Sequence, residues 1–477
     1  MHRGAKPMKR MSTKWLVVVT VLLGTFTVIL NNSSLNPAIP YFMELFHADA
    51  VSVSWIITIF MIAMGMTMPL TGYLGERFGK KRVYLLGLAM FILVSLCGSF
   101  SWNLSSVIFF RGLQGVAGGL MMPLSMALIF EVFGKNERGM ATGVWGIAVM
   151  MAPTIGPTIG GTVIEFGSWH WLFLMNIPTG ILGLLLGIRF LKSTKRDPTL
   201  RFDRFGFVTV TIGIGALLLA LGRISNLQDL TSPVNLSLLI LGLSLIVIFV
   251  RYELKVEKPL LNLKIFKVPT YSISIIVSSV QAMGLFAGMF MIPLLIQSVY
   301  GYSTIVTGLV FLPSALFTGI FMTIAGRMLD RNGPKGIVTT GLIITGATTI
   351  LLSMLKLDSP LAIIFILMMM RGMGLGLSNM PATTAGLNAI PDRLVSQGSA
   401  VNNVMRRVSS SLAIVLISVY FEVRRTQLFA TGQSMEAGNL QAINEGFLVF
   451  GILTILTIPA GLMLRKPKAT SVTTSST

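Results

Sequence analysis

One loop of the chain reads Gly72-Tyr73-Leu74-Gly75-Glu76-Arg77-Phe78-Gly79-Lys80-Lys81. A similar sequence occurs 254 residues later and reads Gly326-Arg327-Met328-Leu329-Asp330-Arg331-Asn332-Gly333-Pro334-Lys335. Both copies carry an acid, an arginine and a glycine at the same spacing. A second echo matches Arg111-Gly112 with Arg371-Gly372. The chain therefore contains two related halves, and any fold assigned to it must accommodate this duplication.

The composition excludes an ordinary soluble protein. Of the 477 residues, 53% are hydrophobic and 11% are charged, against roughly 25% charged in a soluble domain, and the mean hydropathy is +0.80. The single cysteine, Cys97, excludes a disulfide framework, and three scattered histidines disfavour a zinc site. We find no nucleophilic triad, no Cys/His pair and no phosphate-binding loop for ATP, so we expect neither an enzyme nor a bound cofactor.

Fourteen apolar segments are long enough to cross a bilayer, which requires roughly 20 apolar residues each. The segments have these cores: 15–34, 52–74, 83–101, 105–129, 140–164, 169–191, 205–222, 234–251, 270–296, 304–326, 336–354, 360–381, 398–421 and 446–464. The sequence therefore predicts an all-α polytopic membrane protein with fourteen transmembrane helices.

The basic residues predict the orientation. Fourteen spans put both termini on one side, and that side receives all Lys and Arg except eight. Four of the eight lie in the opposite loops and four lie within spans: Arg223, Lys356, Arg424 and Arg425, and then Arg111, Arg371, Arg406 and Arg407. By the positive-inside rule both termini are expected in the cytoplasm of a cell in whose plasma membrane the protein lies. The net charge of +20 is then a topology signal and does not indicate nucleic acid.

The repeat divides the chain into three parts. We expect an N-terminal six-helix bundle over 1–191, two inserted helices with their linkers over 192–267, and a C-terminal six-helix bundle with a tail over 268–477. Duplicated halves related by an axis along the membrane normal are typical of transporters whose substrate site lies between the halves.

Four motifs carry a family resemblance. The loop from Gly72 to Arg82 resembles motif A of the major facilitator superfamily, with Glu76 in place of the usual Asp, and Arg111-Gly112-Leu113-Gln114-Gly115 resembles motif B. Ala152-Pro153-Thr154-Ile155-Gly156-Pro157-Thr158-Ile159-Gly160-Gly161 resembles the antiporter motif C, and Trp169 to Pro178 resembles the start of the sixth span. Motif C with fourteen spans is similar to the 14-helix branch of drug:proton antiporters, including lincomycin-resistance transporters.

The resemblance implies a major facilitator fold and a secondary active exporter of amphipathic drugs or antibiotics, driven by protons through alternating access. Its expected partners are the lipid bilayer, small amphipathic drugs and protons, with the protein acting as a monomer. In this reading the loop glycines and charges form a cytoplasmic latch, and the motif C residues seal the interface and favour exchange over leak. The latch residues are Gly72, Glu76, Arg77, Gly79, Asp330 and Arg331, and the sealing residues are Pro153, Gly156, Pro157, Gly160 and Gly161.

An arginine within a span is unfavourable unless it faces the bundle interior and finds acceptors. Arg111 lies about seven residues, roughly 10 Å, from the outer end of its span, and Asn31 lies about sixteen residues, roughly 24 Å, from the inner face. The two therefore share a depth, and we expect Asn31, Asn32, Gln114 or a substrate carbonyl to accept from Arg111. A structural arginine bonded to backbone carbonyls is the alternative.

Other polar residues within spans are candidate cavity lining. Asn176 and Gln281 are two of these, although helix packing explains such residues equally well. Arg406 matches the branch pattern in the thirteenth span, and because adjacent residues point about 100° apart on a helix, we expect Arg407 to extend toward the inner headgroups.

The proton pathway lacks an evident carrier. Many members of the branch have Asp where this chain has Asn31, and we place none of the 17 acids near the middle of a span. Three mechanisms remain open: proton coupling through Glu131 or Glu165, transport of a substrate that itself carries the charge, and movement of substrate without coupling to protons. Without a fixed negative charge, the pocket should prefer neutral, zwitterionic or weakly anionic amphiphiles, and Asn31→Asp should widen acceptance toward cations.

Two further functions stay open. The same cavity suits a translocase for lipids or cell-wall precursors. The missing carboxylate suits a membrane sensor that no longer transports, although the near-complete set of gating motifs argues against this.

Overall fold

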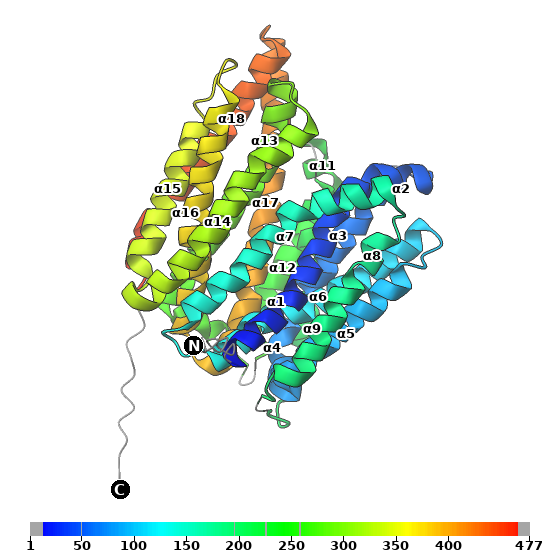
Figure 1. Cartoon of the computed structure of the whole chain (residues 1–477), viewed down its shortest axis with the longest axis vertical. Helices are drawn as coiled ribbons and strands as arrows, with labels where there is room; N and C mark the ends of the chain where they lie inside the picture. The colour runs from blue at the N-terminus through cyan, green and yellow to red at the C-terminus, as the bar shows by residue number, and fades with distance from the viewer. Residues whose placement is uncertain (1–12, 49, 195, 225–226, 257–258, 466–477) are drawn as a thin grey trace, which may run out of the picture.

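The computed structural model describes residues 13–48, 50–194, 196–224, 227–256 and 259–465. Within these ranges every regular element is helical (Figure 1). Twelve of the helices are long and apolar enough to cross a membrane. The prediction of an all-helical polytopic membrane protein is therefore confirmed.

The helices follow the predicted segments closely. The N-terminal half contains α1 (Thr13–Ser34), α2 (Ile39–Leu45), α3 (Ala50–Thr67), α4 (Leu70–Leu74), α5 (Lys80–Gly98), α6 (Leu104–Val132), α7 (Arg138–Phe166), α8 (Trp171–Leu174) and α9 (Asn176–Phe190). The middle contains α10 (Arg204–Arg223), α11 (Leu227–Thr231) and α12 (Pro233–Glu253). The C-terminal half contains α13 (Pro269–Pro293), α14 (Thr304–Asn332), α15 (Pro334–Leu352), α16 (Leu361–Ala389), α17 (Val395–Ala430), α18 (Met435–Leu456) and α19 (Ile458–Met463).

Two of the fourteen predicted spans fall outside the twelve. The second corresponds to α3, whose apolar part Ser52–Thr67 is a shorter helix, and which is followed by α4 and a π-helical turn, Gly75–Gly79. The fifth corresponds to the 29-residue helix α7. The structure thus has a helix at each predicted place, and the count of fourteen spans stays a prediction at these two.

Side-chain caps mark the start of several helices, and one predicted span is divided into two helices. Asn103 and Ser106 form a reciprocal capping box at the start of α6, and Ser232 caps α12 ahead of Pro233. Such caps satisfy the free backbone N–H groups of the first turn. The sixth predicted span is divided into α8 and α9 next to Asn176, and this division gives Asn176 a structural role that is described below.

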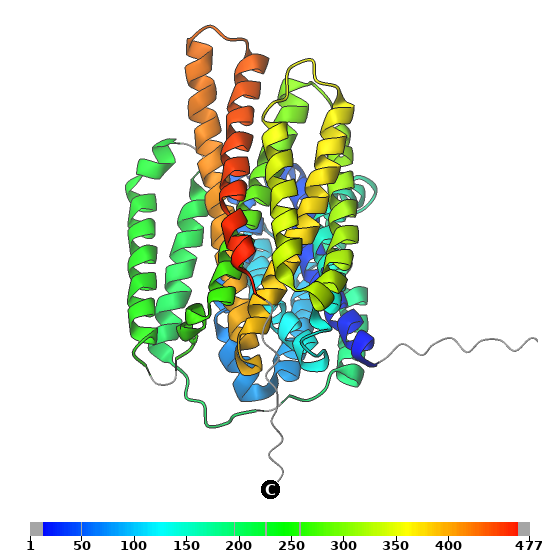
Figure 2. The same cartoon turned by 90° about the vertical axis from the view of Figure 1, so that its left-hand side faces the viewer.

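The inserted helices pack at one edge of the molecule. Helix α10 contacts α12, and it also contacts α3 of the N-terminal half and α17 of the C-terminal half. Figure 2 shows the pair standing beside α17. On the other side of the bundle, α7 packs directly against α14 without an intervening helix. The two interfaces between the halves are therefore built differently.

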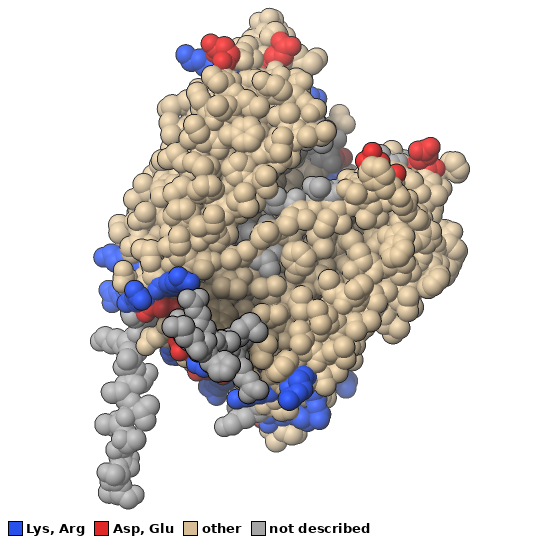
Figure 3. All heavy atoms as spheres, in the orientation of Figure 1, with Lys and Arg blue, Asp and Glu red and all other residues tan. Residues whose placement is uncertain are grey.

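We call the end of the bundle at which the described residues begin with Thr13 and end with Arg465 the basic side, because Lys and Arg gather there (Figure 3). On this side one hydrophobic cluster joins the halves, with Ile129 and Phe130 of α6 packed in the same core as Leu387 and Val395 of the C-terminal half. Toward the opposite side the halves have separate clusters and diverge in the view of Figure 1. The molecule is closed on the basic side.

Candidate functional site

Arg111 is the eighth residue of α6 and has no exposed surface. Its Nε donates to the carbonyl of Ile56 at 2.9 Å, and its Nη1 donates to Asn31 Oδ1 at 2.6 Å and to Gln114 Oε1 at 2.9 Å. Its Nη2 donates to Asn32 Oδ1 at 3.0 Å. The guanidinium also lies 4.2 Å from the ring centroid of Phe60. The predicted juxtaposition of Arg111 with Asn31 is confirmed, and backbone and side-chain acceptors share the guanidinium.

A second layer of hydrogen bonds orients these acceptors. Gln114 Nε2 donates to Ser95 Oγ at 2.8 Å, which turns the amide oxygen toward Arg111. Asn31 Nδ2 donates to the carbonyl of Leu172 at 3.1 Å. Asn176 donates to the same carbonyl and to that of Phe173. Asn176 therefore stabilises the break between α8 and α9, and its 1% exposure places it outside any cavity in this conformation.

The structure changes the expectation for Asn31→Asp. A carboxylate at this position would lie within hydrogen-bond reach of the Arg111 guanidinium, which would neutralise it. We now expect the variant to export neutral drugs and to leave the acceptance of quaternary ammonium dyes unchanged. Parallel efflux assays with one neutral and one quaternary compound measure this. Wider export of the dye would show that the new carboxylate reaches the substrate.

The remaining candidate residues do not join the Arg111 network. Gln281 Nε2 donates to Ser378 Oγ at 2.6 Å, which ties α13 to α16 within the C-terminal half. Arg406 is half-buried on α17. The expectation for Arg407 is wrong: it does not extend to the headgroups, and its Nη2 lies 3.4 Å from Met64 Sδ of α3. It thereby contacts the opposite half, because α17 turns this face toward α3.

The acidic residues of the two repeated loops both reach across to the opposite half. Glu76 Oε1 accepts from Gln397 Nε2 at 3.0 Å, near the start of α17. Asp330 accepts from the backbone N–H groups of Gly139 at 2.8 Å and Met140 at 2.9 Å, in the first turn of α7. A carboxylate at a helix N-terminus satisfies free donors and interacts favourably with the helix dipole. Each repeated loop thus places its acidic residue in contact with the other half of the protein.

The glycines of these loops allow the close approach. A side chain at Gly72 would lie 2.5 Å from Gln397 Cγ. Gly79 and Gly333 occupy equivalent places in the two loops and have φ angles of 93° and 82°, which glycine adopts without strain. Arg77 instead donates to the carbonyl of Leu200 in the linker before α10, so it does not cross between the halves. Arg331 lies at the end of α14 beside Gly333.

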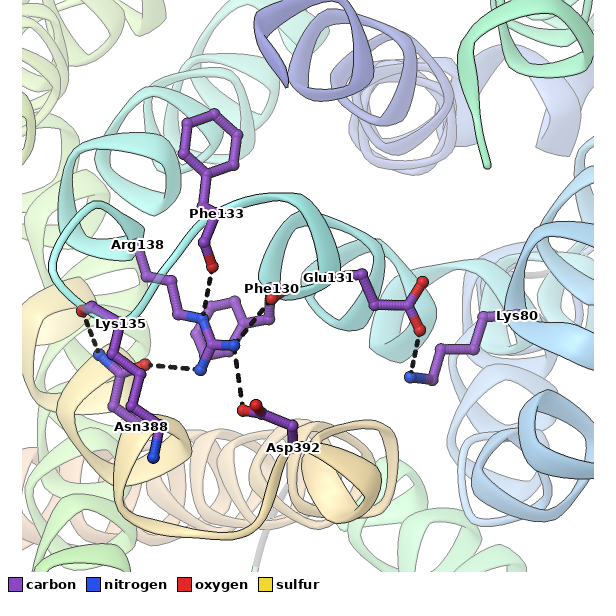
Figure 4. Close-up of polar contacts among 8 residues, drawn as sticks. All are labelled: Lys80, Phe130, Glu131, Phe133, Lys135, Arg138, Asn388 and Asp392. Carbon is purple, nitrogen blue, oxygen red and sulfur yellow. Dashed lines mark hydrogen bonds and ion pairs between the residues drawn. The ribbon is translucent and has the colours of Figure 1, made fainter. Parts of the chain in front are cut away.

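Arg138 is a buried arginine that bonds across the two halves (Figure 4). It is 3% exposed, and it donates to the carbonyls of Phe130 and Phe133 at 2.7 Å and 3.1 Å. Across the interface it donates to Asp392 Oδ1 at 3.0 Å and Asn388 Oδ1 at 3.2 Å. We refer to Glu76, Arg138, Asp330, Asp392 and Gln397 as the basic-side gate.

Sequence reasoning overlooked Arg138, Asp392 and Gln397 as gate residues. The signal was available in the repeat, because Glu137-Arg138 is followed 255 residues later by Asp392-Arg393. This spacing is one residue longer than the offset of 254 residues between the repeated loops. If the two halves are aligned beyond the repeated loops, Glu137-Arg138 and Asp392-Arg393 fall at equivalent helix starts.

The motif C residues pack differently from the expectation. Side chains at Gly156 and Gly160 would lie 1.8 Å from Ser33 Oγ and 1.9 Å from the carbonyl of Ser34, so these glycines let α7 meet α1 within the same half. Gly161 has open space around it. Pro153 is half-buried, and the side chain of Pro157 lies outside the described part of the chain.

Other glycines of α7 make the contact between the halves. A side chain at Gly139 would lie 2.4 Å from the carbonyl of Gly326, and one at Gly143 would lie 2.7 Å from that of Met322, both on α14. Small residues permit such close approach of helix backbones in membranes. In this conformation the described motif C glycines thus pack within the N-terminal half, the close contact between the halves lies nearer the basic end of α7, and the sealing role of motif C stays a prediction.

A cavity of about 550 Å³ lies between the halves toward the opposite side. It is lined by α3, α10, α13 and α17 together with Leu294, and most of its lining is apolar. Its polar members include Thr58, Ser411 and Ser418, and the ion pair of Glu422 with Arg425 at 2.8 Å borders it. The seven substrate or coupling candidates named from the sequence are absent from this lining. Helix α10 supplies three of its residues and the residue that follows the helix, Ile224, supplies a fourth, which sequence reasoning did not anticipate.

A model of the Major Facilitator Superfamily matches residues 21–414. The chain belongs to the major facilitator superfamily. The members of this family are membrane transporters, which agrees with the closed basic side and the cavity between two halves. This protein is therefore a multi-pass membrane transporter rather than an enzyme.

Relatives of this protein within the superfamily are mostly named as transporters or resistance proteins. It is 32% identical over 410 residues to an uncharacterized MFS-type transporter, YhcA, of Bacillus subtilis, covering 86% of this chain and 77% of the relative. It is 26% identical over 457 residues to the lincomycin resistance protein LmrB of Listeria monocytogenes, covering 95% and 97%. A solved structure of a double-tryptophan XylE mutant shares the fold, with a TM-score of 0.68, 14% identity and coverage of 96% and 97%.

Proposed function

We propose that this transporter exports amphipathic drugs or antibiotics, in exchange for protons, by alternating access. The basic side is then cytoplasmic, following the positive-inside rule, and the bilayer is the plasma membrane. The observation that carries the proposal is the combination of a closed basic-side gate with an apolar cavity toward the opposite side. This is the arrangement required of an exporter after it has closed behind its substrate. The similarity to the lincomycin resistance protein LmrB supports drugs as the cargo.

The chemistry of the cavity supports an amphipathic substrate without a strong positive charge. Apolar walls suit a hydrophobic body, and a few hydroxyl groups suit a polar end. Arg111 is enclosed by its own acceptors in this conformation, so we assign it to coupling and to the shape of the N-terminal half. Substrate contact by Arg111 would require the network to open.

Transport in everted vesicles tests the proposal. Vesicles with and without the protein are incubated in a panel of neutral, zwitterionic and cationic drugs, and the pH gradient and membrane potential are collapsed separately. We expect uptake of neutral or zwitterionic compounds that stops when the pH gradient is collapsed. Uptake unaffected by either collapse would refute proton coupling. Transport of a lipid with none of the drugs would favour a lipid translocase.

A further inference from the structure

Two carboxyl groups meet at the basic end of the inserted helices. Asp203 caps α10 by accepting from Gly206 N at 2.8 Å through Oδ1, and Glu253 is the last residue of α12. Because the two helices run antiparallel, the start of one lies beside the end of the other. A side chain at Gly206 would lie 2.3 Å from Asp203 Oδ2 and 2.5 Å from Glu253 Oε1, so the two carboxyl groups lie side by side against the same glycine.

Each carboxyl group has one oxygen without a partner. Glu253 is 2% exposed, and its Oε1 accepts from Leu260 N at 3.2 Å. Among the described residues, Glu253 Oε2 and Asp203 Oδ2 are buried and have no hydrogen-bond partner. The other groups that act on the pair are the phenol of Tyr252, which faces Asp203, and the backbone of Leu261.

Two ionised carboxylates in this position would be unfavourable. They would repel each other in a buried site, and their free oxygens would lack donors. One proton removes both problems, because it leaves a single negative charge and supplies the donor for a hydrogen bond between the two groups.

We propose that Asp203 and Glu253 form a proton-binding site that holds one shared proton, and that this proton stabilises the closed basic-side gate. The role in coupling rests on the proposed function, because it names where an exchanged proton could bind. The proton binding itself stands on the geometry of the pair.

A short segment links the pair to the gate. Leu260, whose N–H binds Glu253, and Leu261 are 2% and 4% exposed, so the segment is packed firmly. Asn262 N–H, two residues after Leu260, donates to Gln397 Oε1 at 2.8 Å, and Gln397 donates in turn to Glu76. Loss of the proton would separate the carboxylates, move Leu260 with Glu253, and weaken the contact of Asn262 with Gln397. We therefore expect deprotonation to favour opening of the basic side.

Infrared difference spectroscopy tests the proton site without a substrate. The full-length protein in nanodiscs is titrated with base, and the carbonyl stretch of a protonated carboxyl group is followed. We expect this band to persist at neutral pH and to be lost in Glu253→Gln and in Asp203→Asn, the latter keeping a residue that caps helices well. Glu131→Gln is the matched control, because Glu131 is ion-paired with Lys80 at 2.6 Å. A band unchanged in both variants would overturn the proposal.

A distance measurement tests the link to the gate. Spin labels replace the exposed residues Phe78 and Arg393 on the two sides of the gate, in a Cys97→Ser background that removes the native thiol. We expect the distance to lengthen as the pH rises in the parent protein and to stay short in Glu253→Gln. A pH-independent distance in the parent protein would overturn the link, and a change produced by Na⁺ at constant pH would assign the pair to a metal cation. Since no drug is present, these results are independent of whether export is observed.

Discussion

Replacement of Arg111 by alanine should abolish transport and destabilise the N-terminal half by about 3 kcal/mol or more. The substitution removes four hydrogen bonds from a charged donor, and each such bond contributes roughly 1.5–3 kcal/mol. It also leaves the side-chain oxygens of Asn31 and Gln114 buried and that of Asn32 half-buried, and among the described residues these three oxygens accept from no other donor. Thermal unfolding in detergent measures the first effect and vesicle efflux the second.

Arg111→Lys separates charge from geometry. An ammonium group keeps the charge but cannot reach the acceptors on α1 and α3 together as the planar guanidinium does. We expect intermediate stability and strongly reduced transport. Full transport by either variant would contradict a role for Arg111 in coupling.

Replacement of Arg138 by alanine should open the basic side. In the parent protein Arg138 bonds to Asp392 and Asn388 across the interface. Asp392 is 67% exposed, so solvent screening reduces the strength of the ion pair. We expect the equilibrium to shift toward the open state by about 1–2 kcal/mol, or roughly tenfold. The alkylation rate of a cysteine replacing Thr384, which is buried against Thr142, measures this in a Cys97→Ser background.

Lys14 and Glu137 provide a matched control for Arg138. Their ion pair at 2.6 Å lies next to the gate, but both partners are about half-exposed and lie within the N-terminal half. The hydrogen bond and charge of Lys14 lower the pKa of the Glu137 carboxyl group, so any stabilisation is present above the ordinary carboxyl pKa and is lost as the pH falls. Glu137→Gln should leave the alkylation rate unchanged. An unchanged rate in Arg138→Ala as well would mean that the contacts of Asp330 and Glu76 hold the gate without Arg138.

The sequence predicted contacts that depend on depth in the membrane. Arg111 and Asn31 could be matched because a helix advances about 1.5 Å per residue, so counting from known helix ends is sufficient. The second layer on Leu172 could not be predicted, since it depends on where the sixth span divides. The identity of the residues that cross the gate depends on which helix ends meet in the closed conformation, and the positions of the spans along the chain do not specify this.

The carboxyl pair was overlooked for a different reason. We searched for acids near the middle of spans, whereas Asp203 and Glu253 lie where two inserted helices begin and end. Antiparallel neighbours necessarily bring such ends together, so the pairing follows from the order of the helices once they are known to be adjacent. Its burial by Leu260 and Leu261 depends on a loop whose path the sequence does not specify.

The inserted helices make the transporter asymmetric in its contact with lipid. A duplicated protein would offer two equivalent boundaries between its halves, and a hydrophobic molecule could diffuse sideways through either of them. Here α10 occupies one boundary between α3 and α17, while α7 and α14 meet directly at the other. The two boundaries therefore present different surfaces to the surrounding leaflet, an inserted helix at one and a direct contact between the halves at the other.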